Sequence, residues 1–175
     1  MPRNVEIKAR CASLAVVEAL AAPLAHAGPV LIQQEDIFFV VDRGRLKLRK
    51  FDATHGELIY YERSDTLEPK ESQYLRTATV EPDALTETLK AVLGLRGIVR
   101  KQRTLYLVGQ TRIHLDQVEG LGSFIELEVV LEPEQTMAQG VQIAHELMQT
   151  LGIRMQDLIK GAYIDLLEDG ASRDG

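Results

Sequence analysis

Residues 111–131 read TRIHLDQVEGLGSFIELEVVL, and within them apolar and charged residues alternate in two segments separated by glycines. Successive side chains of a β-strand point to opposite faces, so this period of two predicts strands over residues 111–117 and 123–131. Each strand then has one apolar face and one face with ionisable side chains. In the second strand the charged face consists of Glu126 and Glu128.

Similar alternation and turn signals divide the rest of the chain. Asp42-Arg43-Gly44 predicts a tight hairpin turn, and Ser13 and Pro82 predict helix starts. Runs of strands with few helices indicate an α+β fold with a largely antiparallel sheet or barrel. Further strands are expected at residues 5–11, 32–41, 45–51, 58–63, 74–80 and 98–108, a polar link at 64–72, and helices after Ser13, after Pro82, at 134–151 and at 163–167.

Composition limits the class of protein. The chain has 175 residues, 45% hydrophobic and 26% charged, which is typical of a globular protein. We expect one domain over residues 1–168 and a disordered tail over residues 169–175. The formal net charge of −6 argues against a non-specific nucleic-acid binder.

Cysteine usage and hydropathy bear on the compartment. The single cysteine, Cys11, excludes an intramolecular disulfide framework and favours a reducing environment. No apolar run is long enough to cross a bilayer, and the start of the chain lacks the apolar stretch of a signal peptide. We therefore predict a cytoplasmic protein with neither a membrane nor a nucleic acid as partner.

Ionisable side chains recur on one face of five predicted strands, and this pattern has two interpretations. An antiparallel sheet with one solvated face also alternates apolar and charged residues. If the charged face instead lines a barrel, like charges repel one another and a ligand must balance them. The pattern alone leaves both open. The faces are Glu6, Lys8 and Arg10; Arg45, Lys47 and Arg49; Lys101 and Arg103; Arg112, His114 and Asp116; and Glu126 and Glu128.

The mixture of signs suits a polyphosphate with bound metal ions. Glu126 and Glu128 lie about 6.5–7 Å apart along their strand, from the rise per residue, and could hold hard cations, with Asp116 and Glu6 completing the site. Mg²⁺ and Mn²⁺ prefer such oxygen ligands. Arg and Lys would take phosphate oxygens. The sequence contains neither a Walker-type glycine loop nor a paired Cys/His metal motif.

Three aromatic or imidazole side chains allow two roles each. His114 is interpreted as the hydrogen-bond partner of a carboxylate, with a general base as the alternative. Tyr60 and Tyr61 are interpreted as packing residues, with a surface for stacking a base as the alternative.

Five segments in one order carry a family resemblance: NVEIKAR at residues 4–10, RLKLR at 45–49, RIHLD at 112–116, LGSFIELE at 121–128 and YIDLL at 163–167. Together they resemble the CYTH superfamily, the triphosphate tunnel metalloenzymes, and are most similar to its class IV adenylyl cyclase-like branch. The first segment is similar to the family's ExExK signature. The resemblance extends from Asn4 to about Leu167.

The resemblance implies an eight-stranded antiparallel closed β-barrel with flanking helices, whose tunnel binds a triphosphate with Mg²⁺ or Mn²⁺. It implies catalytic roles for Lys8 and Arg112. By matching position, the metal ligands would be Glu6, Asp116, Glu126 and Glu128, and the phosphate-binding residues Lys8, Arg10, Arg45, Lys47, Lys101, Arg103 and Arg112.

The sequence departs from the family pattern in two places. Asn4 stands where the first glutamate of ExExK belongs, which removes one negative metal ligand. Residues 58–63 lack the lysine often found on that strand. Both departures bear on catalysis more than on binding.

Four functions are compatible with these residues. The leading hypothesis is a cyclase that converts ATP to cyclic AMP and pyrophosphate, and the second is a triphosphatase acting on thiamine triphosphate or inorganic triphosphate. The third is a non-catalytic binder of polyphosphate or nucleotides, and the fourth an interaction domain with a solvated sheet. For the first three the partner is a small-molecule triphosphate, and we expect a monomer or homodimer.

Overall fold

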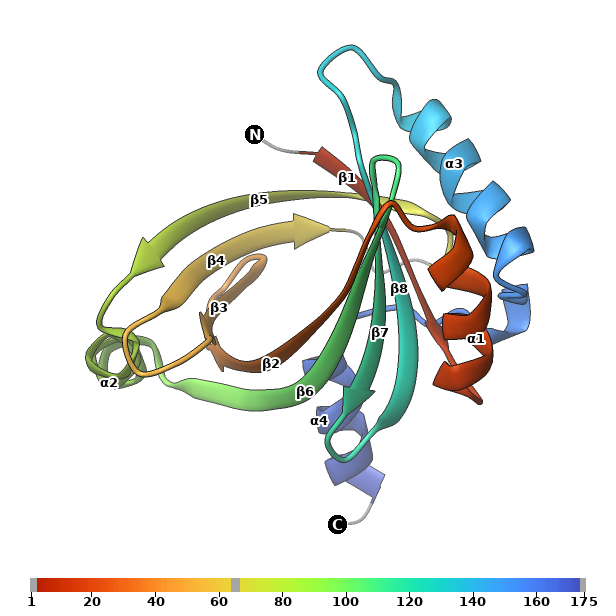
Figure 1. The fold of residues 1–175 in the computed structure, drawn as a ribbon. Helices are drawn as coiled ribbons and strands as arrows, with labels where there is room; N and C mark the ends of the chain where they lie inside the picture. The colour runs from red at the N-terminus through yellow and green to blue at the C-terminus, as the bar shows by residue number, and fades with distance from the viewer. Residues whose placement is uncertain (1–2, 64–66, 174–175) are drawn as a thin grey trace.

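Eight strands in the described part of the chain close into an antiparallel barrel (Figure 1). The computed structural model describes residues 3–63 and 67–173. Around the ring the order is β1-β5-β4-β3-β2-β6-β7-β8, and β1 pairs with β8 to close it. The predicted α+β closed barrel is confirmed. The strands are β1 (Arg3–Arg10), β2 (Ala27–Phe39), β3 (Arg45–Lys50), β4 (Gly56–Arg63), β5 (Lys70–Thr79), β6 (Leu95–Val108), β7 (Thr111–Val118) and β8 (Gly122–Val130).

The helices begin where the sequence supplies caps. α1 (Leu14–Ala21) starts after Ser13, whose Oγ accepts a hydrogen bond from the backbone N–H of Val16. α3 (Met137–Thr150) starts after Thr136, which forms a capping box with Gln139, and so begins later than predicted. The other helices are η1 (Ala22–Leu24), α2 (Pro82–Leu93), η2 (Met155–Asp157) and α4 (Tyr163–Arg173).

Two strands begin several residues earlier than the sequence predicted, because pairing outweighs local signals. β2 begins at Ala27 rather than at residue 32, since its first residues pair with the end of β6. β5 begins at Lys70 rather than at residue 74, since β1 and β4 both pair with its start. The expected polar link is therefore too long, and residues 64–66 lie outside the described residues.

The C-terminal helix is also longer than predicted. α4 continues to Arg173 rather than ending at Leu167, so residues 169–173 of the expected disordered tail are helical. Glu168 in this extension accepts hydrogen bonds from Arg96 of β6 at 2.9 and 3.0 Å, which attaches the helix to the barrel.

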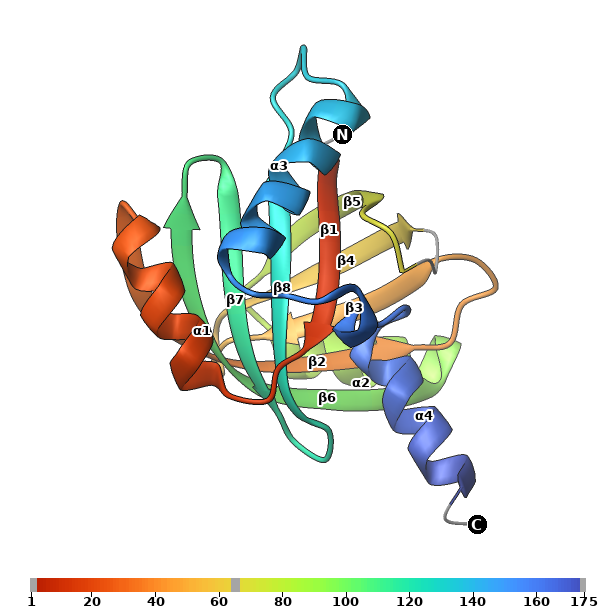
Figure 2. The same cartoon turned by 90° about the vertical axis from the view of Figure 1, so that its right-hand side faces the viewer.

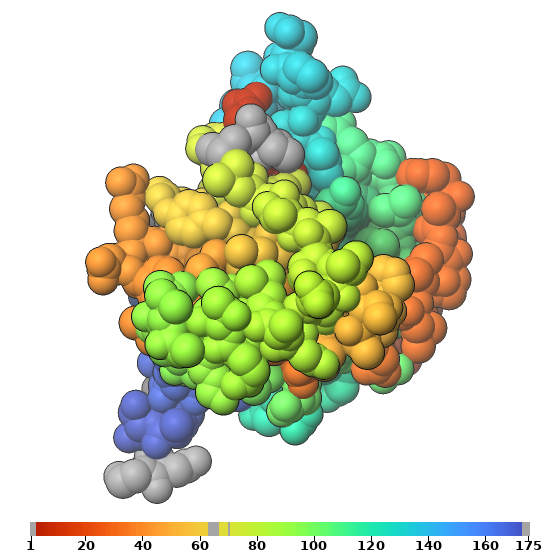
Figure 3. Space-filling model, turned by 90° about the vertical axis from the view of Figure 1, so that its left-hand side faces the viewer, coloured from red at the N-terminus to blue at the C-terminus, as the bar shows by residue number. Residues whose placement is uncertain are grey.

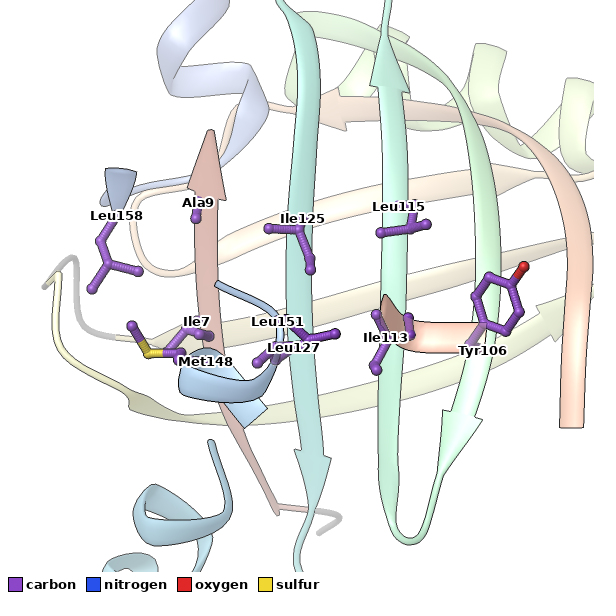
Figure 4. Close-up of a cluster of buried hydrophobic side chains, with 11 residues drawn as sticks. Ile7, Ala9, Tyr106, Ile113, Leu115, Ile125, Leu127, Met148, Leu151 and Leu158 are labelled. Atoms are coloured by element: carbon purple, nitrogen blue, oxygen red, sulfur yellow. The ribbon is translucent and has the colours of Figure 1, made fainter. Parts of the chain in front are cut away.

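The apolar sides of the strands face outward, and helices cover them. α1 and α3 lie over the outer side of β1, β7 and β8 (Figure 2). In the core between them, Ile7, Ile113 and Leu127 of the sheet cluster with Met148 of α3 and with Leu151 (Figure 4). Burial of this apolar surface stabilises the fold by about 25 cal/mol per Å² removed from water.

α2 covers a different part of the barrel. Its Leu85 and Leu89 pack against Phe39 of β2 and Leu48 of β3. Figure 3 looks onto this side, with α2 in green at the front. Since the apolar sides of the strands point to the helices, the alternation of side chains turns the charged sides inward. The solvated-face interpretation is therefore wrong for these strands.

Candidate functional site

The barrel encloses a tunnel with a cavity of about 90 Å³. This space is several times that needed for one water molecule. Among the described residues, ten lining side chains are formally charged, six of them basic and four acidic, so the lining carries more positive than negative charge. They are Lys8, Lys47, Arg49, Arg76, Lys101 and Arg103, and Glu6, Asp36, Glu126 and Glu128.

A basic cluster surrounds Asp36 on one wall of the tunnel. Arg49 donates two hydrogen bonds to the Asp36 carboxylate, at 2.8 and 2.9 Å, and Lys47 donates another at 2.7 Å. Lys101 Nζ lies 3.7 Å from Asp36 Oδ2. Burial raises the pKa of Asp36, but Arg49, Lys47 and Lys101 outweigh it and hold that pKa well below its usual range. Asp36 is therefore an ionised counterion to three cations.

The two lysines of this cluster have pKa values below the usual value of a lysine. Burial, with Arg103 nearby, lowers the pKa of Lys101 to about 8. Burial and the neighbouring Arg49 hold the pKa of Lys47 well below 10.5. Concentrated buried positive charge of this kind is stabilised by a multivalent anion.

Arg103 forms the centre of a second cluster. Its Nε and Nη2 donate to the two oxygens of Asp116, each at 2.7 Å, and Nη2 lies 3.8 Å from Glu126. The Tyr163 hydroxyl donates to Asp116 Oδ2 at 2.8 Å. Burial raises the pKa of Asp116, but Arg103 outweighs it and lowers that pKa to about 2. The Asp116 carboxylate lies behind the lining and holds Arg103 in a fixed orientation.

Carboxylates line the opposite wall, where β1 and β8 pair. Glu6 lies directly across from Glu128, and Lys8 directly across from Glu126 at an ion-pair distance of 3.6 Å. Burial and the nearby Glu6 raise the pKa of Glu128. Burial also raises the pKa of Glu126, but Lys8 outweighs it and lowers that pKa well below 4.5. Facing like charges such as Glu6 and Glu128 are destabilising unless a cation lies between them.

His114 lies between two of these carboxylates. Its Nδ1 is 3.6 Å from Glu126 and its Nε2 is 3.9 Å from Glu128, both longer than a hydrogen bond. Burial, with Arg103 close by, lowers the pKa of His114 to about 4, so the ring is neutral at neutral pH. The predicted hydrogen bond from His114 to a carboxylate is therefore not formed.

The remaining residues predicted to bind phosphate are outside the cavity lining. Arg10 is exposed at the end of β1, with its guanidinium 5.3 Å from the Phe124 ring centroid. Arg45 pairs with Asp165 of α4 at 2.8 Å. Arg112 pairs with Glu128 at 3.2 Å, and 37% of its side chain is exposed. The structure thus brings together Lys8, Lys47, Lys101 and Arg103, but not Arg10, Arg45 or Arg112.

The sequence-based analysis missed two residues of the site. Asp36 lies on the same face of its strand as Gln34 and Phe38, two residues to either side. Because residues 37–41 are apolar or aromatic on both faces, no charged face could be recognised in this strand. Tyr163 extends from the start of α4 into the tunnel, where its ring centroid lies 4.0 Å from Lys8 Nζ and 5.1 Å from Lys101 Nζ. No local pattern indicates Tyr163, because its position follows from the packing of α4.

Of the two tyrosines with alternative roles, Tyr61 lines the cavity, 9% exposed, beside Phe38 and Ile59. Tyr60 points to the other side of β4 and donates a hydrogen bond to Glu62.

The carboxylate wall is chemically suited to a hard divalent cation. Glu6 and Glu128 face each other, and the buried Asn4 Oδ1 has no hydrogen-bond partner among the described residues. Carboxylate and amide oxygens are the ligands that Mg²⁺ and Mn²⁺ prefer. Among those residues no three His, Cys, Asp or Glu side chains form a ready-made metal site. In the structure, Glu126 is paired with Lys8 and Glu128 with Arg112.

An antiparallel barrel with a buried, charged tunnel is the class of protein that the fold and the site define. A family model for the CYTH domain matches residues 2–163, and the chain belongs to that family. The family predicted from the sequence is thus confirmed. A search of curated proteins found no match to the sequence.

Solved structures share this fold. The PH1012 protein of Pyrococcus horikoshii has a TM-score of 0.83 at 24% identity, covering 93% of this chain and 98% of that one. An adenylate cyclase candidate from Vibrio parahaemolyticus has a TM-score of 0.75 at 19% identity, covering 94% and 97%. An adenylyl cyclase candidate from Hippeastrum, described as having dominant triphosphatase activity, has a TM-score of 0.64 at 15% identity, covering 97% and 96%.

Helices in the described part of the chain lack the combination of length and apolar character that crossing a bilayer requires.

Proposed function

We propose that this chain is a metal-dependent enzyme that acts on a triphosphate held in the barrel tunnel. One observation carries the proposal: six basic and four acidic side chains line one cavity within the barrel, in the part of the chain that the structure describes. A small polyanion accompanied by a divalent cation matches both signs of charge. The family membership and the adenylate cyclase-like and triphosphatase neighbours agree with it.

In the proposed site, Lys8, Lys47, Arg49, Lys101 and Arg103 bind phosphate oxygens. The guanidinium of Arg103, held by Asp116, would present its remaining N–H donors in fixed directions. Asp36 positions Lys47 and Arg49 in the empty tunnel. When the triphosphate binds, its oxygens replace the Asp36 carboxylate as their partner. Arg112 acts indirectly, since its contact is with Glu128 rather than with the cavity.

Glu6, Glu126 and Glu128 would hold Mg²⁺ or Mn²⁺. Such an ion, when bound, neutralises negative charge that develops on the leaving phosphate group. The protein needs no nucleophilic side chain, because phosphoryl-type transfer depends on alignment and electrostatic stabilisation. Asp116 is the weakest of the four predicted metal ligands, because Arg103 binds both of its oxygens.

Two reactions are compatible with this arrangement. In a cyclase, the ribose 3′-hydroxyl attacks the α-phosphorus and pyrophosphate leaves. In a triphosphatase, water attacks the terminal phosphorus, the bond from that phosphorus to the bridging oxygen breaks, and the diphosphate leaves while orthophosphate is formed. The lining favours hydrolysis, because it is dominated by ionic groups that match phosphates, and a nucleoside would have to lie towards a tunnel mouth.

The test is product analysis with Mg²⁺ or Mn²⁺ and, separately, ATP, thiamine triphosphate and inorganic triphosphate. Cyclic AMP with pyrophosphate would identify a cyclase, and orthophosphate a triphosphatase. The double variant Glu126→Gln, Glu128→Gln should lose metal-dependent activity by at least about 100-fold and remain folded.

The matched control is Glu132→Gln, Glu134→Gln, which removes two exposed carboxylates at the same spacing and should leave activity unchanged. No product and no thermal stabilisation by any triphosphate would overturn the proposed function.

A further inference from the structure

Arg76 lines the tunnel, yet the proposed function gives it no role. It lies on the same side of β5 as the buried Ser72 and the partly buried Tyr74, which also line the cavity, but its own side chain is exposed. The pairing of β5 with β1 runs from Lys70 to Gln73, and Arg76 lies beyond it. A side chain that both lines the cavity and meets solvent lies at a mouth of the tunnel.

The charge of Arg76 is not offset in the way that the other basic charges of the lining are. Each of the other five pairs with a carboxylate. Among the described residues Arg76 has no carboxylate partner, and its guanidinium carbon lies 4.8 Å from the centroid of the Tyr74 ring. A guanidinium over an aromatic face keeps its N–H donors in a planar fork. Arg76 can therefore bind an anion without first losing an ion pair.

Tyr74 gives this guanidinium a fixed support. The Tyr74 hydroxyl accepts a hydrogen bond from Nδ2 of the buried Asn4 at 3.2 Å, which ties the ring to β1. The stacking limits the directions that the long Arg76 side chain takes in solvent, so less conformational entropy is lost when it binds a ligand.

Arg76 is also in register with the basic cluster inside the barrel. Ile59 of β4 is the pairing partner of Arg76 on β5 and of Lys47 on β3. Two strand spacings separate Arg76 from Lys47, which is about 10 Å between their backbones, and both side chains belong to the tunnel side. An anion that meets Arg76 at the mouth is therefore close to Lys47, whose partner in the empty tunnel is Asp36.

Exposed and buried charges of a binding site affect different rates. A charge at the rim acts mainly on association, whereas removing one partner of a buried pair acts mainly on dissociation. Arg76 is the rim charge of this lining, and Arg103, which is 5% exposed, is of the second kind.

We propose that Arg76 makes the first contact with the incoming triphosphate and sets its rate of entry into the tunnel. The phosphate oxygens then reach Lys47 and displace Asp36 from it. This inference rests on the proposed function, because it requires a triphosphate as the ligand.

The experiment is stopped-flow measurement of the binding of diimidotriphosphate, whose P–N–P bridges resist hydrolysis. Tyr61, Tyr74 and Tyr163 line the cavity and the chain has no tryptophan, so tyrosine fluorescence follows binding. At about 0.1 M NaCl, Arg76→Ala should lower the association rate constant by about fivefold and change the dissociation rate constant by less than about twofold. At about 1 M NaCl most of the difference in association should disappear, because salt screens an exposed charge.

Arg76→Lys keeps the charge and should keep at least about half of the native association rate constant. Arg154→Ala is the matched control, because it removes an arginine whose side chain is 66% exposed and lies outside the cavity lining, and it should leave both rate constants unchanged. An unchanged association rate constant in Arg76→Ala, an effect confined to dissociation, or an equal loss in Arg154→Ala would overturn the inference while leaving triphosphate binding intact. Absence of any binding of the analogue to the native protein, checked by calorimetry, would overturn the proposed function as well.

Discussion

Several charged residues of the tunnel are paired with counterions, so part of the interior charge is offset before any ligand enters. Asp36 is the extreme case, since it is 1% exposed and contacts Lys47, Arg49 and Lys101. Removing one partner of a buried ion pair is more damaging than losing an exposed pair, because the other charge stays buried without compensation. The stability of the empty tunnel should therefore depend on Asp36.

Asp36→Asn is expected to lower the free energy of unfolding at neutral pH by about 3–5 kcal/mol, measured by urea denaturation. The native Asp36 pKa is depressed, so its contribution is present above the unfolded value of about 3.9 and is lost as the pH falls below it. The variant should lack this part of the acid sensitivity. Added inorganic triphosphate should restore part of the lost stability, because phosphate oxygens replace the carboxylate.

Asp83→Asn is the control, since Asp83 pairs with Lys50 but its side chain is 68% exposed. That substitution should change stability by no more than about 1 kcal/mol. Equal effects of the two substitutions would contradict the role given to Asp36.

Period-two alternation predicted which face of a strand carries each charged side chain. It did not predict where along the barrel axis that side chain lies. Lys8, Lys101 and Arg103 lie in the cavity as expected. Arg10 and Arg112 have the predicted parity, yet they lie near the ends of their strands and outside the cavity lining. Depth depends on strand register, which a single sequence does not reveal.

At the scale of elements, close packing of helices on the barrel fixes the wall geometry. Gly140 places α3 against β1 and the end of β8. A Cβ at Gly140 would lie 2.5 Å from Leu131 Cδ2 and 2.6 Å from Val5 Cγ2. Leu131 can adjust at its flexible end, but the β-branched Val5 is stiff, so the helix would have to move. Val5 is the strand neighbour of both Asn4 and Glu6.

Gly140→Ala is therefore expected to lower the free energy of unfolding by about 1–3 kcal/mol, although alanine is the better helix former. The measurement is urea denaturation. Gly170→Ala in α4 is the matched control, because a Cβ there meets no atom within 4 Å and should raise stability by up to about 1 kcal/mol. Equal gains in both variants would show that α3 tolerates the added methyl group.

Element types could be predicted from the sequence, whereas several boundaries could not. Ser13 and Thr136 define helix starts locally through their side chains. The starts of β2 and β5 depend on partner strands that are distant in the sequence. The entry of α4 into the tunnel through Tyr163 is a tertiary effect with no local signal.

For the whole molecule, charge is segregated by sign between inside and outside. The full chain has a formal net charge of −6, while basic side chains outnumber acidic ones among the described tunnel residues. The exterior therefore carries an excess of negative charge, which repels polyanions. The proposed triphosphate would be attracted by the excess of basic side chains in the tunnel.

This segregation predicts a weak dependence of triphosphate affinity on salt. Raising NaCl from about 0.1 M to about 1 M shortens the Debye length from about 10 Å to about 3 Å, but buried pairs are screened much less. The dissociation constant measured by calorimetry should change by less than about tenfold. Arg103→Ala should weaken binding at both salt concentrations. A steep loss of affinity with salt that Arg103→Ala does not alter would place the binding outside the tunnel.

Closure of the barrel between β1 and β8 has a consequence for synthesis of the protein. Of the eight strands, β1 is synthesised first and β8 last. The edge of β1 that pairs with β8, where Val5 lies opposite Val129, therefore stays unpaired until β8 has been synthesised. Until then the nascent chain exposes an open sheet edge. One face of that sheet carries the charged side chains of the tunnel, and the other carries apolar side chains of the core. Such long-range pairing slows folding and leaves intermediates prone to aggregation, so we expect the growing chain to require protection until β8 is translated.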